Sequence, residues 1–434
     1  MTISRRSASF SRTLVATAMG ACLLVGCGAL PGGSGGSGDT LTVMTFAPEG
    51  TKATNMPGMI GMAKAYERWV NSKGGINGRK LRVLTCNEKN TANGAADCAR
   101  KAISEKAVAV VGSYSQHGRA FMAPLEVEGI PFIGGYGVSS EEFQSTLSYP
   151  VNGGQPVLIT GAGHQLGRAC EKVALVRPDT LVGDTLPVLL NAGLRANQMP
   201  DASDIRAAED SADFTAQARE ALTSTGGGGG GGGAKDKDKN NGCVTAVLGE
   251  RTETFFDAFR RTEPQRKKPQ ISSVLGSVSQ SLVDRTGGKD SPFEGAYVTS
   301  WYPVAADPLW QPMKKVIADF AFGDDTVDAD DSGTQTTWIA YTVLEQILKG
   351  FKKDDDVSAR KVARALNQVQ AVKTGGLTPD LSWRYQDMRA VTGFPRIVNG
   401  RVTFQVVQSG RLVAQPGEQS LDMTPTLERA PRGA

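Results

Sequence analysis

The residues whose type and spacing could support chemistry are, first, four cysteines: Cys86, Cys98, Cys170 and Cys243. They could form disulfides or bind a metal. No C-x-x-C pair is present, which argues against a zinc site. An even number of cysteines favours disulfides in an exported protein, although four cysteines allow three pairings. Cys86 ends a predicted strand and Cys98 lies in the following predicted helix, while Cys170 and Cys243 each lie at the start of a predicted strand. We therefore predict the pairs Cys86–Cys98 and Cys170–Cys243.

Catalytic chemistry has little support among the other side chains. The chain has two histidines, His117 and His164, which are too few for a histidine-rich metal site or for most hydrolase triads. We find no nucleophile elbow and no cluster of metal ligands. The acidic run at 324–331 lacks the spacing of an EF-hand, so a solvated surface loop is the better interpretation than a calcium site. We predict no catalytic residue, no metal and no cofactor.

The first 39 residues predict export and a lipid anchor. Residues 1–13 are basic and rich in serine, and 14–25 form an apolar core too short to span a bilayer. The sequence Leu-Val-Gly before Cys27 resembles a bacterial lipobox, in which the cysteine is lipidated after cleavage. We predict a signal peptide at 1–26, lipidation of Cys27, a flexible tether at 27–39, and a location at the outer face of the cytoplasmic membrane. An ordinary signal peptide with a chance cysteine is the alternative.

Composition and charge exclude several classes of protein. The chain has 434 residues, of which 40% are hydrophobic and 21% are charged, enough to bury the cores of two domains. Its formal charge is +4, and three of its arginines lie in the predicted signal peptide, so the mature protein is nearly neutral. We therefore expect no nucleic-acid binding. The long apolar stretch is N-terminal, which excludes a polytopic membrane protein. We expect a monomer.

Short apolar strands alternate with amphipathic helices along most of the chain, which implies parallel sheets with helices on both faces. The first set is strand 41–46, helix 59–73, strand 81–85, helix 93–105, strand 107–111, helix 115–128 and strand 130–133. The second set is helix 155–169, strand 173–176, helix 181–195, strand 196–199, helix 212–222, strand 244–248, helix 252–261 and strands 270–274 and 295–301. Helices 307–322, 334–349 and 357–369 follow, and a ribbon at 401–407 and 411–413 closes the pattern.

This pattern predicts an α/β protein of two lobes, each a doubly wound parallel sheet, with several crossings between them. Ligands in open parallel sheets bind beyond the carboxyl ends of the strands, so two facing lobes make a closable cleft. The predicted division is 40–150 plus 302–372 for lobe 1, 151–301 plus 373–415 for lobe 2 with a low-complexity insertion at 226–242, and a tail at 416–434.

Seven segments resemble the type I periplasmic-binding-protein family, in particular its branched-chain amino acid (leucine, isoleucine, valine) receptors. These receptors are substrate-binding lipoproteins of ABC transporters. The segments are VNSKGGINGRKL, CNEKNTANGAADCARK, AVVGSYSQHG, IPFIGGYGVSS, VALVRPDTLVGDT, AVLGERTETFFDAF and EGAYVTSWYPVAADP, within residues 40–410. The resemblance implies two Rossmann-like lobes joined by hinge crossovers.

The resemblance also implies that loops after the strands hold the ligand. Small hydroxyls and backbone amides at helix starts can hold a carboxylate, and Ser115 opens one predicted helix. Tyr136 can form an aromatic wall. The implied ligand-binding residues are Ser113, Tyr114, Ser115, Gln116, Gly135, Tyr136, Gly137, Asp179, Thr180, Glu250, Arg251, Thr252, Gly276 and Ser277.

One departure from the family pattern concerns the ligand's ammonium group. Amino acid receptors of this type place an acid in the last second-lobe loop, where this chain has Gly276 and Ser277. Asp179 or Glu250 can replace that acid; otherwise the ligand is not an α-amino acid.

The resemblance predicts a receptor that captures a small polar solute, such as an amino acid, an amide or a related organic acid. It would close about its hinge and deliver the solute to an ABC transporter permease. A lipoprotein that senses the solute and signals to a membrane partner would have the same sequence features. An exported hydrolase is the remaining alternative.

Overall fold

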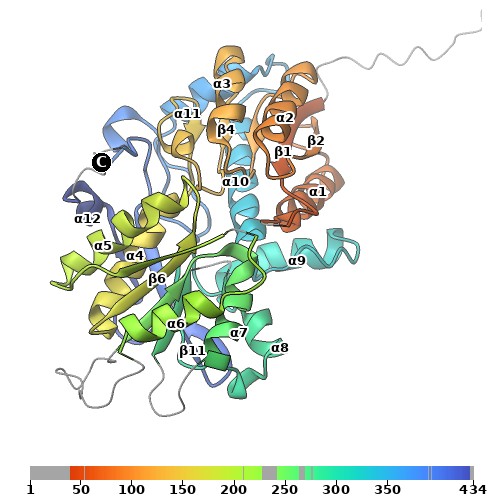
Figure 1. Ribbon diagram of the computed structural model, residues 1–434. Coiled ribbons are helices and arrows are strands. Elements are labelled where there is room, and N and C mark those ends of the chain that lie inside the picture. The colour runs from red at the N-terminus through yellow and green to blue at the C-terminus, as the bar shows by residue number, and fades with distance from the viewer. Residues whose placement is uncertain are drawn as a thin grey trace, which may run out of the picture. The chain divides into compact units, whose positions relative to one another are not determined.

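A computed structural model describes residues 40–430 with the exception of 53, 209, 227–241, 263–268, 275–276, 390 and 392. The predicted signal peptide, lipidation site and tether lie outside the described residues, and so does most of the predicted insertion. The described part forms two sheets with flanking helices (Figure 1), which confirms the predicted α/β class and the two lobes. Among its helices, none combines the length and the apolar composition needed to cross a membrane.

The first sheet has five strands, all parallel, in the order β2-β1-β3-β4-β5. Parallel strands need cover on both faces, and the buried apolar side chains of β1 and β3 provide apolar surface to both layers. The strands are β1 (Thr40–Ala47), β2 (Lys80–Asn87), β3 (Val110–Val111), β4 (Phe132–Ile133) and β5 (Ser148–Tyr149). The helices around them are α1 (Pro57–Ser72), α2 (Ala92–Ser104), α3 (Gly118–Glu128), α9 (Gln311–Phe320), α10 (Ser332–Lys349) and α11 (Ala359–Gln368).

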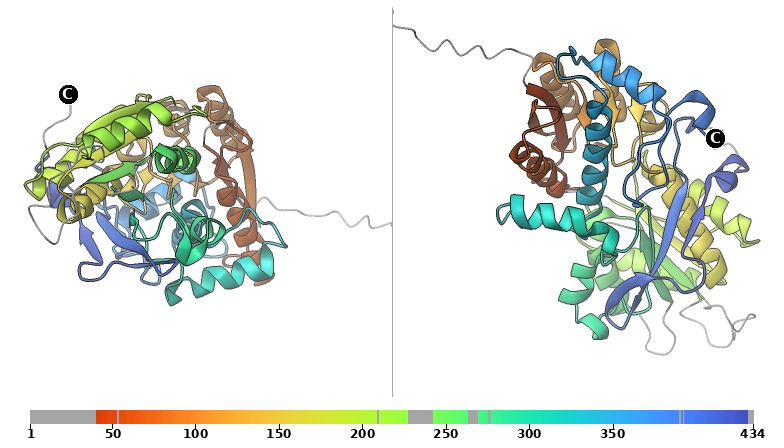
Figure 2. Two further views of the ribbon diagram at one scale, coloured as in Figure 1. Left: turned by 60° about the horizontal axis from the view of Figure 1, so that its bottom comes forward. Right: turned by 180° about the vertical axis from the view of Figure 1, so that it is seen from behind.

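Late helices complete this first lobe. The α10 helix packs against α1 and the ends of β3 and β4, although about 200 residues separate it from β4 along the chain. The right view of Figure 2 shows the blue-green helix α10 beside the orange and brown elements of the first lobe. The chain therefore returns to this lobe after building most of the second.

The second sheet runs β12-β11-β10-β9-β8-β6-β7, with β13 paired to β11. Strands β6 to β10 are parallel, whereas β11, β12 and β13 form antiparallel pairs. Its strands are β6 (Val173–Pro178), β7 (Ser203–Ala207), β8 (Cys243–Ala246), β9 (Gln270–Val274), β10 (Tyr297–Ser300), β11 (Arg401–Gln408), β12 (Arg411–Ala414) and β13 (Ser420–Asp422). Its helices are α4 (Gly154–Ala169), α5 (Leu186–Ala196), α6 (Thr215–Ser224), α7 (Thr252–Thr262), α8 (Gln280–Arg285) and α12 (Thr424–Glu428).

The predicted strand at 196–199 is wrong. Helix α5 continues to Ala196, and Gln198 then adopts a left-handed backbone with a φ of 60°. A residue in that conformation ends a helix and cannot continue as a strand. Strand β7 begins only at Ser203, where Ile205 and Ala207 alternate inward as β7 pairs with β6.

Three crossover segments connect the sheets and are hydrogen-bonded to one another. Asn152 lies on the first crossover and donates from Nδ2 to the Tyr302 hydroxyl on the second, at 3.0 Å. Asn399, on the third, donates from Nδ2 to the Val151 carbonyl at 3.0 Å. These bonds hold the crossovers together at one place, which is the arrangement that a hinge between lobes requires.

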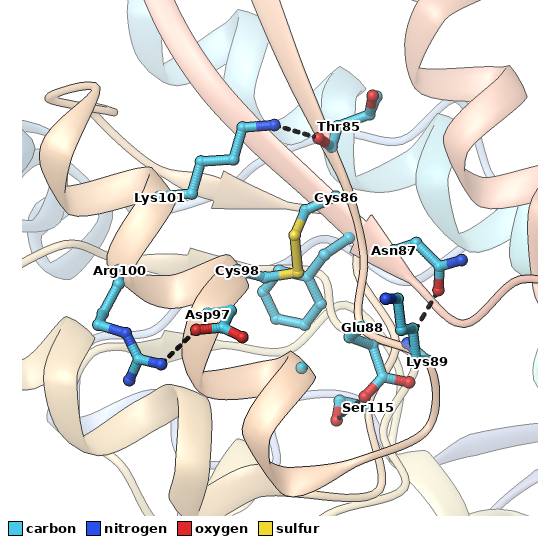
Figure 3. Close-up of a disulfide and its surroundings, with 12 residues drawn as sticks. Thr85, Cys86, Asn87, Glu88, Lys89, Asp97, Cys98, Arg100, Lys101 and Ser115 are labelled. Atoms are coloured by element: carbon cyan, nitrogen blue, oxygen red, sulfur yellow. Dashed lines mark hydrogen bonds and ion pairs between the residues drawn. A yellow bond between two sulfur atoms is a disulfide. The ribbon is translucent and has the colours of Figure 1, made fainter.

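Both predicted disulfides are confirmed. Cys86 at the end of β2 joins Cys98 in α2, with a Cα–Cα distance of 5.6 Å (Figure 3). Cys170 precedes β6 and joins Cys243, the first residue of β8, at 5.9 Å. The second pair forms because β6 and β8 are parallel neighbours with Val173 opposite Cys243. Each lobe therefore contains one disulfide.

Candidate functional site

A cavity of about 290 Å³ lies where the carboxyl ends of both sheets face each other. Loops after β1, β3 and β4 line it from the first lobe, and loops after β6, β8, β9 and β10 line it from the second. The starts of α4 and α10 complete the wall. The volume is at the small end of the range for ligand pockets, which suits a small molecule.

Three aromatic side chains form one side of this cavity. Tyr136 lies between Tyr114 and Trp301, with ring centroids 5.2 Å from each. All three rings are buried. Trp301 donates its indole N–H to the Gly154 carbonyl at 3.0 Å, and the Tyr136 hydroxyl bonds Ser332 Oγ at 2.7 Å. The polar tips are thus bonded within the protein, which fixes the orientation of Tyr136 and Trp301.

Trp301 was absent from the predicted ligand residues, yet the signal for it was present in the sequence. It directly follows β10, the fifth parallel strand of the second sheet. The rule that ligands bind beyond strand ends applies to that strand as it does to the others.

The first-lobe loops divide into residues that face the cavity and residues that build the loops. Tyr114, Gln116 and Tyr136 line the cavity. Ser113, Ser115, Gly135 and Gly137 were also predicted to contact ligand but are not among the lining residues. Helix α3 begins at Gly118, so Ser115 does not open it as predicted.

The hydroxyls of both predicted serines are bonded within the protein. Ser113 Oγ accepts the Phe46 amide at 3.0 Å. Ser115 Oγ donates to the buried Glu88 carboxylate at 3.0 Å and accepts the His117 amide at 3.0 Å (Figure 3). Ser113 therefore connects the loop after β3 to strand β1, and Ser115 connects it to the loop after β2.

A buried carboxylate organises the loop after β4. Glu142 accepts the amides of Gly137 at 2.9 Å and of Val138 and Ser139 at 3.0 Å each. Burial raises the pKa of Glu142 to about 7, even though the hydrogen bonds from these donors act to lower it. The amides that the sequence offered for a ligand carboxylate therefore already bind a carboxylate of the protein.

The second-lobe residues divide in the same way. Thr180 and Ser277 line the cavity. Asp179 instead lies 3.6 Å from Arg206, with both side chains more than half exposed. Thr252 Oγ1 accepts the Leu248 amide at 3.1 Å. Gly276 and the side chain of Glu250 lie outside the described part of the chain.

Asp331 is the one charged side chain among the described residues that line the cavity. It caps helix α10, because its Oδ1 accepts the Thr334 amide at 2.7 Å. Burial raises the pKa of Asp331, and the nearby Asp328 carboxylate raises it further, whereas the hydrogen bonds at the helix start lower it. The acidic run at 324–331 was predicted to be a solvated loop, but its last residue, Asp331, reaches the cavity.

A family model described as "Periplasmic binding protein" matches residues 44–395, which is most of the chain. The chain belongs to the periplasmic binding protein family. Members of this family bind solutes and are not enzymes, in agreement with the prediction, and membership implies a location outside the cytoplasm. A search of curated proteins found no match.

Solved structures show the same fold as this periplasmic binding protein at low sequence identity. An extracellular ligand-binding receptor from Verminephrobacter eiseniae is 17% identical, with a TM-score of 0.65 over 86% of this chain and 99% of that one. A possible leucine/isoleucine/valine-binding protein from Rhodopirellula baltica is 14% identical, with a TM-score of 0.68 over 90% and 98%. A solute-binding protein of an ABC transporter from Rhodopseudomonas palustris, in complex with p-hydroxybenzoic acid, is 14% identical, with a TM-score of 0.66 over 90% and 100%.

The two lobes of this periplasmic binding protein touch beside the cavity. Arg251 follows β8 in the second lobe and donates from Nη2 to the carbonyl oxygen of Lys52 in the first, at 2.8 Å. Gly249 and Thr54 approach each other in the same region and both line the cavity. Arg251, which was predicted to contact ligand, is not among the lining residues, and its guanidinium bridges the lobes.

Proposed function

We propose that this protein is an extracytoplasmic receptor that captures one small polar solute between its lobes by hinge closure and delivers it to the permease of an ABC importer. The observation that carries the proposal is the cavity itself, which loops of both sheets line and across which Arg251 bridges to Lys52. A ligand there contacts both lobes at once, so it binds the closed state more tightly than the open state and shifts the population toward closure.

The solute belongs, on this proposal, to the range of amino acids, amides and related organic acids. Two of the similar structures, a possible leucine/isoleucine/valine-binding protein and a protein with bound p-hydroxybenzoic acid, have descriptions that name solutes of this size. The proposed contacts are Tyr114, Gln116, Tyr136, Thr180 and Ser277, with Trp301 and Asp331 added from the cavity lining.

The mature protein works at the membrane in this proposal. A signal peptide at 1–26 and a lipid on Cys27 would anchor it, and residues 27–39 would let the lobes reach the permease. We propose lobe limits of 40–150 plus 302–372 and 151–301 plus 373–415, and a monomeric receptor. Changing Cys27 to Ala should move the protein from the membrane fraction to the soluble fraction, and an unchanged distribution would contradict the anchor.

The central experiment combines binding with uptake. The protein is partly unfolded and dialysed to remove co-purified ligand, and the released compounds are identified by mass spectrometry. Refolded protein is then screened against amino acids, amides and organic acids by thermal denaturation. We expect a saturable rise in melting temperature for one chemical class, since a ligand that binds only the folded state stabilises it. The proposal fails if nothing co-purifies and no compound of the panel stabilises the protein.

Uptake then separates import from sensing. Deleting the gene should abolish uptake of the radiolabelled solute, and expression of the intact chain should restore it. Normal uptake together with a lost transcriptional response to the solute would instead identify a sensor that signals to a membrane partner.

A further inference from the structure

The charge of the cavity lining points to a narrower ligand class than its size does. Among the described lining residues there is one acid, Asp331, and there is no arginine, lysine or histidine. The undescribed residues next to the lining segments in sequence are Ala53, Leu275 and Gly276, and the side chain of Glu250 beside Gly249 is also undescribed; none of these residues is basic. Among the described lining residues, a ligand carboxylate would therefore find no cationic side chain to pair with, and it would share a small space with Asp331.

Several donors in the first-lobe loops that could hold a ligand carboxylate are already hydrogen-bonded to carboxylates of the protein. The amides of Gly137, Val138 and Ser139 donate to Glu142, and Ser115 Oγ donates to Glu88. Each of these donors would have to leave a buried carboxylate before it could bind a ligand carboxylate. The exchange is unfavourable, because a buried charge that loses its hydrogen-bond donors has no water to replace them.

The same lining suits a cation. The rings of Tyr114, Tyr136 and Trp301 form a continuous aromatic surface, and a cation is attracted to the face of such rings. Asp331 caps α10 through Oδ1, and the Thr334 hydroxyl and the Gly333 amide also interact with its carboxylate. A carboxylate has about four acceptor sites, so it can still accept a donor from a ligand. Asp328 lies close enough to raise the pKa of Asp331 further, which adds negative potential at this end of the cavity.

Arg251 does not supply a positive charge to the cavity lining. It lies two residues after the lining Gly249, but it does not line the cavity, and its guanidinium donates to the Lys52 carbonyl.

We propose that the cavity selects an organic cation, namely a small amine or quaternary ammonium on an apolar body without a carboxylate, whose charged group lies between the aromatic surface and Asp331. The inference rests on the proposed receptor function but departs from the solute range given there, because an organic cation without a carboxylate is neither an amino acid nor an organic acid. Tyr114, Tyr136 and Trp301 hold the apolar body and face the cation, and Asp331 pairs with its charge.

The test uses ligands of one body that differ in their charged group. Benzylamine, benzyltrimethylammonium, benzamide and benzoate are titrated into the full mature protein by calorimetry, with phenylalanine as a zwitterion. We expect the two cations to bind at least about tenfold tighter than benzamide, and benzoate to bind most weakly, because an ion pair and a cation–π contact are lost and a repulsion is gained. Benzoate that binds as tightly as benzylamine overturns the inference and leaves the receptor function standing.

A second arm tests Asp331 itself. Changing Asp331 to Asn keeps a good helix cap, so the fold of α10 is retained. We expect D331N to lose about tenfold in benzylamine affinity and less than about twofold in benzamide affinity. The matched control is Asp307→Asn, which alters another capping aspartate that accepts the Leu309 amide outside the cavity. Unchanged benzylamine affinity in D331N overturns the inference, and failure of every probe to bind at millimolar concentration overturns the receptor function with it.

Discussion

The two walls of the cavity are built on different principles. The first-lobe loops after β3 and β4 are tied to buried carboxylates, Glu88 and Glu142, so their backbone and hydroxyl groups are already hydrogen-bonded. The second-lobe loops after β6 and β8 have charged side chains with partners outside the cavity, such as Asp179 beside Arg206 and Arg251 on Lys52.

The first wall is therefore a preformed surface, whereas the second wall would be completed only when the lobes close. The first wall keeps its shape because its bonds are internal to one lobe and buried, where hydrogen bonds to charged groups are strong. The bond from Arg251 exists only when the lobes meet. On the proposed closure, the first lobe would hold the shape of the site and the second lobe would respond to the ligand.

The largest expected effect is the loss of stability when a disulfide is removed, and it should differ between the two lobes. Changing Cys170 and Cys243 to Ala should lower the free energy of unfolding by about 4 kcal/mol, against about 3 kcal/mol for the Cys86 and Cys98 pair, because a longer loop loses more entropy on closure. The sequence separations are 73 and 12 residues. Urea denaturation of both double variants measures the difference, and a larger loss in the first lobe would reverse the expectation.

The next largest effect is the pH dependence of the free energy of unfolding, to which Glu142 of the first wall contributes. Its pKa is raised from 4.5 to about 7 in the folded protein, so the folded state binds the proton more tightly than the unfolded chain. The resulting stabilisation is complete below pH 4.5 and is lost as the pH rises through about 7. It amounts to about 3 kcal/mol at 1.4 kcal/mol per unit of pKa. Glu88 contributes in the same direction, since burial raises its pKa.

The variant Glu142→Gln tests this assignment. Its free energy of unfolding should depend much less on pH between 5 and 8 (roughly the window around that pKa), while the exposed Glu128→Gln should retain the full dependence. Identical profiles for the parent protein and E142Q would show that the first wall is not held by this carboxylate.

A smaller effect concerns the hydroxyl that joins the aromatic surface to α10. Tyr136→Phe keeps the ring and removes the bond to Ser332, which should weaken ligand binding by about 1 kcal/mol, or about fivefold. Tyr297→Phe, on β10 and outside the cavity lining, is the matched control. Calorimetry with the solute found in the screen measures both, and equal affinities in the two variants would rule out a positioning role for the hydroxyl.

The smallest effect tests the bridge from the second wall. Arg251→Ala should weaken binding by about twofold to fivefold, since a partly exposed hydrogen bond contributes about 0.5–1 kcal/mol. Arg206→Ala, whose partner Asp179 lies in the same lobe, should leave affinity unchanged. Small-angle scattering should show fewer closed molecules for R251A at a given ligand concentration. A greater loss for R206A than for R251A would contradict the proposed bridge.

The positions of the site were predictable from sequence, but the roles of its polar groups were not. Strand periodicity placed Tyr114, Tyr136 and Thr180 after their strands, and the fold brings them to one cavity. Nothing in the local sequence distinguishes Glu142 from the neighbouring Glu141, yet only the former is buried and bonded to three amides. Burial of a charged side chain depends on contacts between distant segments.

The same reason explains Asp331. Its acidic neighbours made a solvated loop the natural interpretation, because the sequence predicts that this helix belongs to the first lobe but does not show that its start lies at the cavity. The misplaced strand at 196–199 has a local cause instead, the left-handed Gln198.

The Cys170–Cys243 disulfide also determines whether the fragments separate after a protease cuts the chain. It brackets 72 consecutive residues, from 171 to 242, including the glycine run of the sequence. A single nick anywhere in that stretch leaves both fragments covalently joined, so a cleaved molecule keeps its full mass until a reducing agent separates the pieces. Gel bands from cells should therefore be compared with and without reductant before any fragment is taken for a degraded receptor.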